Sequence, residues 1–133
     1  MKITKVQLSS KELSKIVVEG MLEKKALDVV VLDLKEIKQS IADYFVICSG
    51  NTVNQVDAIS DSIEEMVYKH TQENPWHKEG KDNKEWILMD YVNVVAHVFR
   101  KDRRDFYALE DLWGDAVVTE INPDDDPNNI YNY

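Results

Sequence analysis

The sequence predicts an α/β (α+β) domain in which a single mixed β-sheet is flanked by helices. Two β-branched apolar runs of strand length, residues 26–34 and 43–49, lie near segments whose apolar residues recur at helical spacing. The apolar residues of both runs fall on both faces of the strand, which is typical of strands covered on both sides. Two further strand-like runs lie within residues 85–100. Helices packed on one mixed sheet satisfy all of these requirements.

The first helix is predicted from Ser9 to about Lys25. The segment Ser9-Ser10-Lys11-Glu12 has the form of a capping box, in which the first and last residues satisfy each other's backbone donors. The strand at residues 26–34 follows it, and residues 35–42 read as a loop or short turn before the second strand.

The second helix is predicted from Thr52 to about Thr71. Thr52 and Gln55 have the spacing of another capping box, and Gly50-Asn51 supplies the turn before it. Pro75 ends the segment, because the residue before a proline avoids helical angles.

Residues 85–100 predict a β-hairpin that turns at Val92-Asn93. This turn opposes Tyr91 to Val94, and it defines two faces by alternation. One face is almost wholly apolar and suits burial under helices: Ile87, Met89, Tyr91, Val94, Ala96 and Val98. The other face is apolar but carries one acid and one imidazole: Trp86, Leu88, Asp90, Val95, His97 and Phe99.

This second face has two interpretations. An aromatic anchor with aliphatic neighbours and a few polar groups is typical of a protein–protein interface. Alternatively, both faces are core, and Asp90 and His97 satisfy each other across the hairpin. Near-total burial of Trp86 and His97 would contradict the interface interpretation.

The remaining segments complete an α-β-β-α-β-β-α order. Residues 76–83 read as a polar turn, residues 101–113 as a final helix with Gly114 as its C-cap, and residues 116–121 as an edge strand. The acidic, proline-containing residues 122–133 are predicted to be a disordered tail. A single domain therefore covers residues 1–121.

The charge distribution argues against a protein that holds RNA chiefly through its phosphates. The net charge is −9, whereas neutralising phosphates requires a basic face. From Leu112 onward the chain has no Lys or Arg, and a basic cluster lies within residues 100–104. A protein–protein contact is compatible with this pattern, and broad RNA binding is not.

Composition also predicts where the protein works. The one cysteine, Cys48, excludes a disulfide within the chain, which fits a reducing compartment. The N-terminus has no apolar signal region, and no apolar stretch approaches the length that crosses a bilayer. We therefore expect a cytoplasmic protein without membrane contact.

The sequence contains no motif that predicts catalytic, cofactor-binding or metal-binding residues. Residues 49–52 lack a phosphate-binding glycine motif, and the three histidines have no metal-ligand spacing. His97 with Asp90 could act as a general base, but a strand histidine near a carboxylate is more often structural. Cys48 is expected to be an inert core thiol.

Seven segments taken in order resemble the ribosome-silencing-factor (Iojap-like) family, from about Ser10 to Trp113. The residues that carry the resemblance are ALDV at 26–29, IADYFVICSGNT at 41–52, QV and AI within 55–59, Pro75 with Glu79-Gly80, WILMDY at 86–91, Val95 with HVF at 97–99, and Arg104, Tyr107, Leu109-Glu110 and Leu112-Trp113. Val92 stands where some members have glycine, and the acidic tail lies outside the resemblance.

The resemblance implies a nucleotidyltransferase-like layout without catalytic residues. It also implies binding to ribosomal protein fourteen on the joining face of the large ribosomal subunit, which blocks the small subunit and lowers translation. A role in large-subunit biogenesis is implied as well.

On this basis we expect the hairpin face to be the docking surface. Trp86 would be its anchor, Asp90 would meet a basic group, and His97 would exchange a hydrogen bond with the partner. A minor rRNA contact through Arg103 and Arg104 is weighed against a simple solvated helix face. Two alternatives stay open: a nucleotide-binding or nucleotidyltransferase-like enzyme, and a module that forms a homodimer when free.

Overall fold

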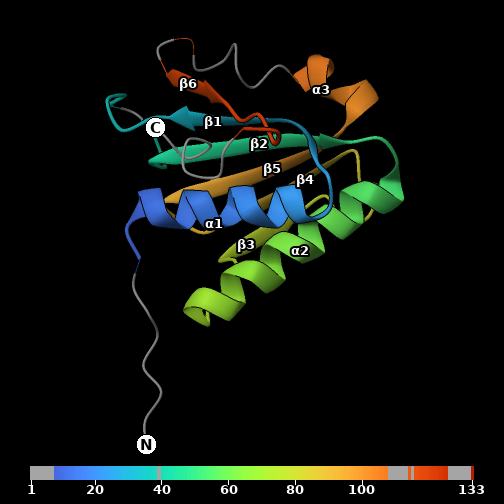
Figure 1. Ribbon diagram of the computed structural model, residues 1–133, viewed down its shortest axis with the longest axis horizontal. Coiled ribbons are helices and arrows are strands. Elements are labelled where there is room, and N and C mark those ends of the chain that lie inside the picture. Colours follow the sequence, from blue (N-terminus) through green and yellow to red (C-terminus); the bar gives the residue numbers. More distant parts are fainter. Residues whose placement is uncertain (1–7, 39, 108–113, 115, 126–132) are drawn as a thin grey trace, which may run out of the picture.

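The computed structural model describes residues 8–38, 40–107, 114, 116–125 and 133, except for the side chains of residues 105–107. Its elements are α1 (Ser10–Glu23), β1 (Leu27–Asp33), β2 (Tyr44–Gly50), α2 (Val53–Thr71), β3 (His77–Glu79), β4 (Trp86–Asp90), β5 (Val94–Arg100), α3 (Lys101–Tyr107) and β6 (Val117–Glu120). Figure 1 shows them in place.

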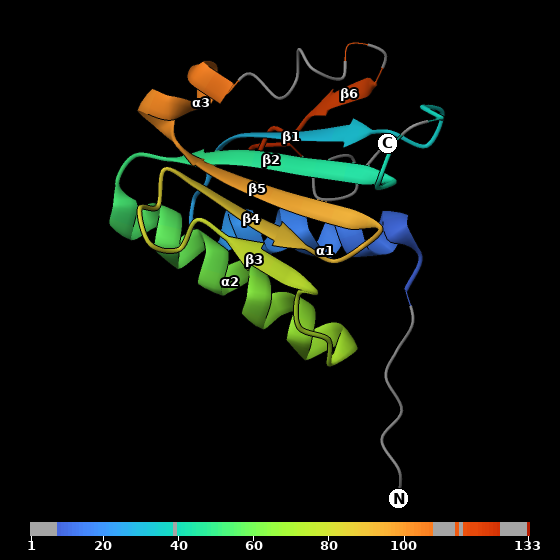
Figure 2. The same cartoon turned by 180° about the vertical axis from the view of Figure 1, so that it is seen from behind.

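The strands form one mixed sheet in the order β3-β4-β5-β2-β1-β6. β2 and β5 are parallel, and the other neighbouring strands are antiparallel. The predicted fold class is therefore confirmed. Both long helices lie on one face of this sheet, and Figure 2 shows the opposite face, which no long helix crosses.

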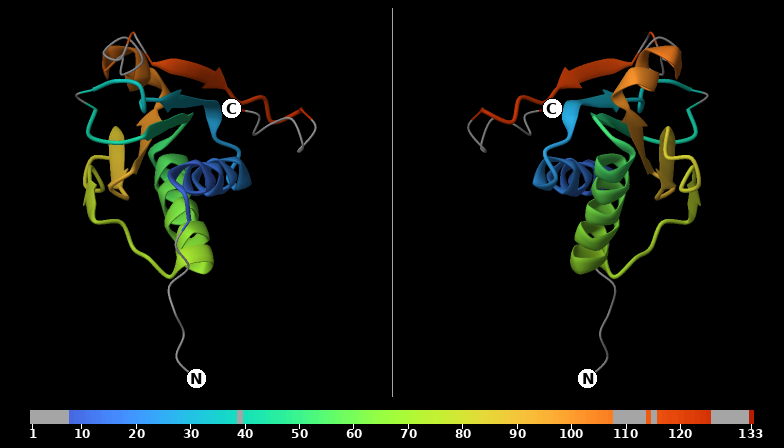
Figure 3. Two further views of the ribbon diagram at one scale, coloured as in Figure 1. Left: turned by 90° about the vertical axis from the view of Figure 1, so that its left-hand side faces the viewer. Right: turned by 90° about the vertical axis from the view of Figure 1, so that its right-hand side faces the viewer.

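Each face of the sheet has its own apolar core. The larger core fills the space between the sheet and the two helices, with residues such as Val17, Ile63 and Val98 fully buried. The smaller core lies on the opposite face, where Leu34 and Ala42 from the segment after β1 pack on Phe45 and Val95. Figure 3 looks along the sheet and shows this segment on the side away from α1 and α2.

The first predicted capping box is confirmed. Glu12 N donates to Ser9 Oγ at 3.1 Å, and Ser9 N donates to Glu12 Oε1 at 3.2 Å.

The second helix start differs from the predicted box. Gln55 N does donate to Thr52 Oγ1, but the Gln55 side chain accepts from Asn51 N at 2.7 Å. Its amide nitrogen then donates to the carbonyls of Lys24 and Lys25. The glutamine reaches one residue further back because it also ties the start of α2 to the end of α1.

The hairpin register is as predicted, with Trp86 opposite Phe99 and Asp90 opposite Val95. Val92 occupies the left-handed region at φ 76°, where a β-branched residue is strained. Asp90 Oδ1 accepts from Val92 N at 2.7 Å and supports this turn.

The prediction was wrong for residues 76–83. His77–Glu79 pair with β4 as the edge strand β3, although none of the three is buried. Exposed residues give no apolar alternation, so the sequence lacks the usual strand signal.

Predictions near the C-terminus have mixed outcomes. β6 confirms the predicted edge strand by pairing with β1. The predicted final helix begins at Lys101 as α3, and its further part, residues 108–113, lies outside the described residues. The same holds for most of the predicted disordered tail, although Tyr133 lies with its hydroxyl 2.7 Å from Ser14 Oγ.

Candidate protein-binding face

The hairpin face predicted to bind a partner lies on the sheet surface opposite α1 and α2 (Figure 2). Its three β4 residues, Trp86, Leu88 and Asp90, are partly exposed. Its three β5 residues are buried: Val95, His97 and Phe99 are 3%, 2% and 1% exposed.

The difference arises from position in the sheet. β5 is flanked by β2 and lies under the smaller core, whereas β4 borders the three-residue edge strand β3. The face therefore presents an accessible row on β4 that rests on a buried row on β5. The expected direct contact between His97 and a partner does not fit this burial, but the accessibility of Trp86 does fit an interface.

Trp86 is held in place by the residues beneath it. Its indole Nε1 donates to His97 Nδ1 at 3.0 Å, and its ring stacks on Phe99 with centroids 5.1 Å apart. Phe45 meets the His97 ring edge-to-face at 4.6 Å. These contacts therefore hold the indole ring in one orientation.

The hydrogen bond from Trp86 fixes the protonation state of His97. An indole nitrogen only donates, so His97 Nδ1 must accept and the imidazole must be neutral with its proton on Nε2. Burial lowers the pKa of His97 to about 3, which agrees with this state. His97 Nε2 is buried and has no hydrogen-bond partner among the described residues.

The alternative in which Asp90 and His97 satisfy each other is not observed. Asp90 opposes Val95 rather than His97, and its carboxylate accepts from the backbone of Val92. His97 is instead bonded to the indole, so the two groups do not form the general-base pair considered from the sequence.

The edge strand β3 widens this face with His77 and Glu79, neither of which was predicted to be a site residue. His77 and Glu79 oppose Asp90 and Leu88, and opposed residues share a face of the sheet. His77 Nε2 and Glu79 Oε1 lie 2.9 Å apart, and both side chains are more than half exposed. The sequence signal was missing because this strand has no buried residue.

Ion pairs join β3 and the loop after it to α2. Lys81 Nζ lies 2.6 Å from Asp57 Oδ1 and 3.2 Å from Asp61 Oδ1, and Lys78 Nζ lies 2.9 Å from Glu64 Oε2. The hydrogen bond from Lys81 lowers the pKa of the Asp57 carboxyl. These pairs place Lys78 of β3 and Lys81 of the loop on the helix side of the sheet.

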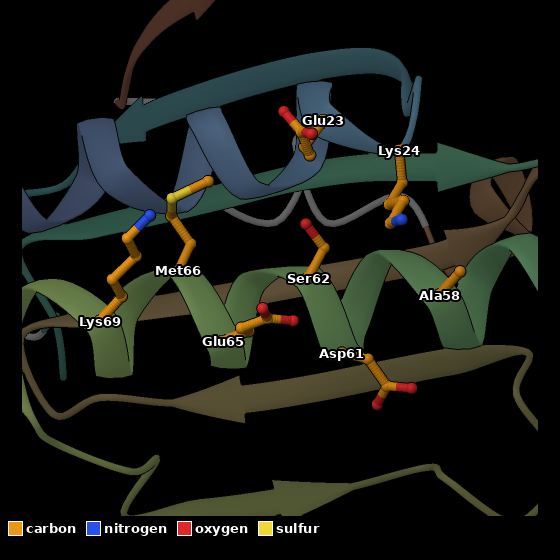
Figure 4. Close-up of a pocket in the computed structure, with 8 residues that line it drawn as sticks. All are labelled: Glu23, Lys24, Ala58, Asp61, Ser62, Glu65, Met66 and Lys69. Carbon is orange, nitrogen blue, oxygen red and sulfur yellow. The ribbon is translucent and has the colours of Figure 1, made fainter.

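A groove with a volume of about 570 Å³ lies between α1 and α2. In Figure 4, Ser62 and Asp61 point to opposite sides of α2. Ser62 Oγ donates to Gly20 O at 2.7 Å, which joins the helices, and Asp61 pairs with Lys81. Ser62 and Asp61 thus each have a structural partner within the domain.

The structure also bears on Cys48, on metal binding and on membrane-spanning helices. Cys48 is fully buried in β2, and burial raises the pKa of its thiol, so it is a core residue as predicted. Within the described ranges, no three or more His, Cys, Asp or Glu side chains gather as a metal site would require. In the same part of the chain, no helix is both long and apolar enough to cross a membrane.

Comparison with known proteins decides the family. The family model described as "Ribosomal silencing factor during starvation" matches residues 7–131. The chain belongs to this family of ribosomal silencing factors. The match extends past Trp113 into the acidic tail, so the part of the chain covered is longer than the sequence segments indicated.

Named relatives support the same family assignment. The ribosomal silencing factor of Halalkalibacterium halodurans is 41% identical over 114 residues, which is 86% of this chain and 96% of that protein. A mouse protein named for mitochondrial assembly of the ribosomal large subunit is 33% identical over 94 residues, which cover 68% of this chain and 40% of the mouse protein.

The fold of the family is also known from crystal structures. A protein from Chromobacterium violaceum, 30% identical, superimposes with a TM-score of 0.75 over 80% of this chain and 88% of the other. The relatives named as silencing factors are regulatory proteins, which is consistent with a function that requires no catalysis.

Proposed function

We propose that this ribosomal silencing factor binds the large ribosomal subunit through ribosomal protein fourteen and blocks the small subunit from joining it. Family membership supports the repression of translation. The name of the mouse relative supports the large subunit as the partner, and with it an accessory role in large-subunit biogenesis. The site of action is the cytoplasm.

The observation that carries this proposal is the fixed, accessible indole of Trp86 on a face that no long helix covers. Tryptophan is over-represented among the residues that dominate binding energy, and such residues lie among energetically minor neighbours. We assign direct contact to Trp86, Leu88 and Asp90. The buried residues Val95, His97 and Phe99 belong to the same site as its support.

The mechanism is steric and requires no bond to be made or broken. A rigid domain anchored on the joining face of one subunit occupies the space of the other. The carboxylate of Asp90 meets a basic group on the partner, which speeds association more than it strengthens the complex.

Contact with rRNA is a minor part of the proposal. Arg103 lies 3.6 Å from the Glu85 carboxylate, and Arg104 donates to Asp28 O and Ser49 Oγ. Because both guanidinium groups already have partners in the domain, any phosphate contact is secondary to the protein contact.

A homodimer of the free protein is the second candidate. Trp86 and Leu88 would be covered in such a dimer, so it would compete with ribosome binding for the same face.

Co-sedimentation with purified large and small subunits tests the proposal. We expect the wild type to migrate with large subunits only, and Trp86→Ala to lose about 2–4 kcal/mol of binding free energy. Trp76→Ala is the matched control, because Trp76 is a second exposed tryptophan (81%) that immediately precedes β3 and is not one of the six hairpin-face residues. Migration of Trp86→Ala at wild-type levels would contradict the assigned face.

A further inference from the structure

A small cavity beside Trp86 is lined by acidic, polar, aromatic and aliphatic residues. Its volume is about 210 Å³, and Glu79, Gly80, Asn83, Trp86 and Leu88 line it. We propose that this cavity is a subsite for one cationic side chain, an arginine or a lysine, of the protein partner. The inference rests on the proposed function and specifies what the Trp86 face recognises.

The aromatic wall of the cavity is fixed in advance. The bond to His97 Nδ1 and the stacking on Phe99 hold the Trp86 ring. A ring that does not move can receive a cation over its face without first losing side-chain freedom. His97 is therefore a positioning residue for this subsite rather than a contact.

The opposite wall is held close to Trp86 by the backbone. Gly80 has φ +88°, and a β-carbon added there would lie 1.9 Å from Trp86 O. Only glycine permits this approach of the loop to the strand. Asn83 is fixed as well, since its Oδ1 accepts from Glu85 N at 3.1 Å. Both sides of the cavity are thus preformed.

The carboxylate of Glu79 gives the cavity its charge preference. The neighbouring lysines are bound on the other side of the sheet: Lys78 to Glu64, and Lys81 to Asp57 and Asp61. Among the described residues, no lysine or arginine lies within ion-pair distance of Glu79, and its Oε1 lies 2.9 Å from His77 Nε2. The Glu79 carboxylate can therefore accept a cationic group from a partner.

Other occupants fit less well. An apolar side chain would remove water from the Glu79 carboxylate without replacing its hydrogen bonds, and an anion would be repelled. A guanidinium or ammonium group can pair with Glu79 while its stem lies against Trp86 and Leu88.

An NMR titration of the free protein tests the subsite without ribosomes. The probes are N-acetyl-arginine amide and N-acetyl-citrulline amide, which share a shape but differ in charge. We expect the arginine probe to shift the Trp86 indole signal and the Gly80 amide saturably, and the citrulline probe to bind at least about fivefold more weakly. The indole signal is assigned with Trp86→Phe.

Two variants sharpen the titration. Glu79→Gln should weaken the arginine probe about fivefold to tenfold, as expected for the loss of a charge-assisted contact. His77→Gln, which keeps the carboxylate, should leave it unchanged. Equal shifts with both probes, or no saturable shift with either, would overturn the subsite.

A second arm measures the affinity of Glu79→Gln for large subunits. A roughly tenfold loss with a weaker salt dependence supports the subsite. If Glu79→Gln binds as tightly as the wild type while Trp86→Ala does not bind, the subsite is wrong and the proposed function stands. If the wild type itself does not bind, the proposed function fails, and the probe titration still decides whether the cavity prefers a cation.

Discussion

The two faces of one sheet are covered in different ways. On the first face, α1 and α2 cover the strands, and residues such as Ile63, Met89 and Val98 are wholly buried in an apolar core. On the second, short segments cover part of a smaller core, and a polar group, His97, lies among its buried residues. The same strands supply both faces by alternation.

Under the proposed function, this contrast separates the residues that stabilise the domain from those that bind the partner. Where two long helices cover the sheet, little apolar surface is left for a partner. Where no long helix does, Trp86 and Leu88 stay partly exposed on a rigid base. Variants of the first face should therefore change folding, and variants of the second should change binding.

The largest effect is expected for Ile63→Ala on the helix-covered face. Ile63 is fully buried, and a β-carbon at Gly20 would lie 2.9 Å from its Cα, so the helices are already in close contact there. The cavity left by the truncation should lower the free energy of unfolding by about 2–5 kcal/mol. Urea unfolding measures this change.

The folded fraction of Ile63→Ala should bind large subunits with the same affinity as the wild type. A binding loss of the size seen for Trp86→Ala would mean that the two faces are not separable.

The next effect is a pH dependence that originates on the second face. His97 has a pKa of about 3 in the folded protein, against an ordinary value near 6.5 when unfolded. Its contribution to stability is complete above the unfolded pKa and falls as the pH drops toward 3. Between pH 6 and pH 4 the loss should be about 2 kcal/mol.

The measurement compares urea unfolding of the wild type and His97→Phe over this pH range. Carboxylates also titrate there, so the informative quantity is the difference between the two slopes. Equal slopes would show that His97 is not held neutral in the folded protein.

A smaller effect is expected for Asp90→Asn. The asparagine oxygen can still accept from Val92 N, so the strained turn keeps its support while the charge is removed. Association with large subunits should slow by about threefold to fivefold at low salt, with little change in the dissociation rate. Stopped-flow binding at two salt concentrations checks this, and a change confined to dissociation would contradict it.

Most of the fold follows from patterns that the sequence displays locally. The β-branched runs specify β1 and β2, Ser9 with Glu12 specifies the start of α1, and the hairpin register follows from a two-residue turn at Val92 and Asn93. Each of these signals lies within or next to the element that it predicts, so each element can be recognised without knowledge of the others.

The remaining features depend on contacts that no local pattern records. β3 is a strand only because β4 pairs with it, and the bond between Trp86 and His97 requires two side chains from adjacent strands to meet. The alternation in the sequence puts both residues on one face of the sheet. It does not predict which of the two side chains is buried. That depended on the segment after β1, whose Leu34 and Ala42 cover the β5 side.

The central claim is that the accessible row on β4 keeps the ribosomal subunits apart. A light-scattering assay of subunit joining measures this directly, with large subunits incubated with the wild type, Trp76→Ala or Trp86→Ala before small subunits are added. We expect the wild type and Trp76→Ala to suppress joining equally, and Trp86→Ala to require a concentration roughly 30-fold to 1000-fold higher. Equal suppression by all three proteins would contradict the account, because the Trp86 face would then have no part in separating the subunits.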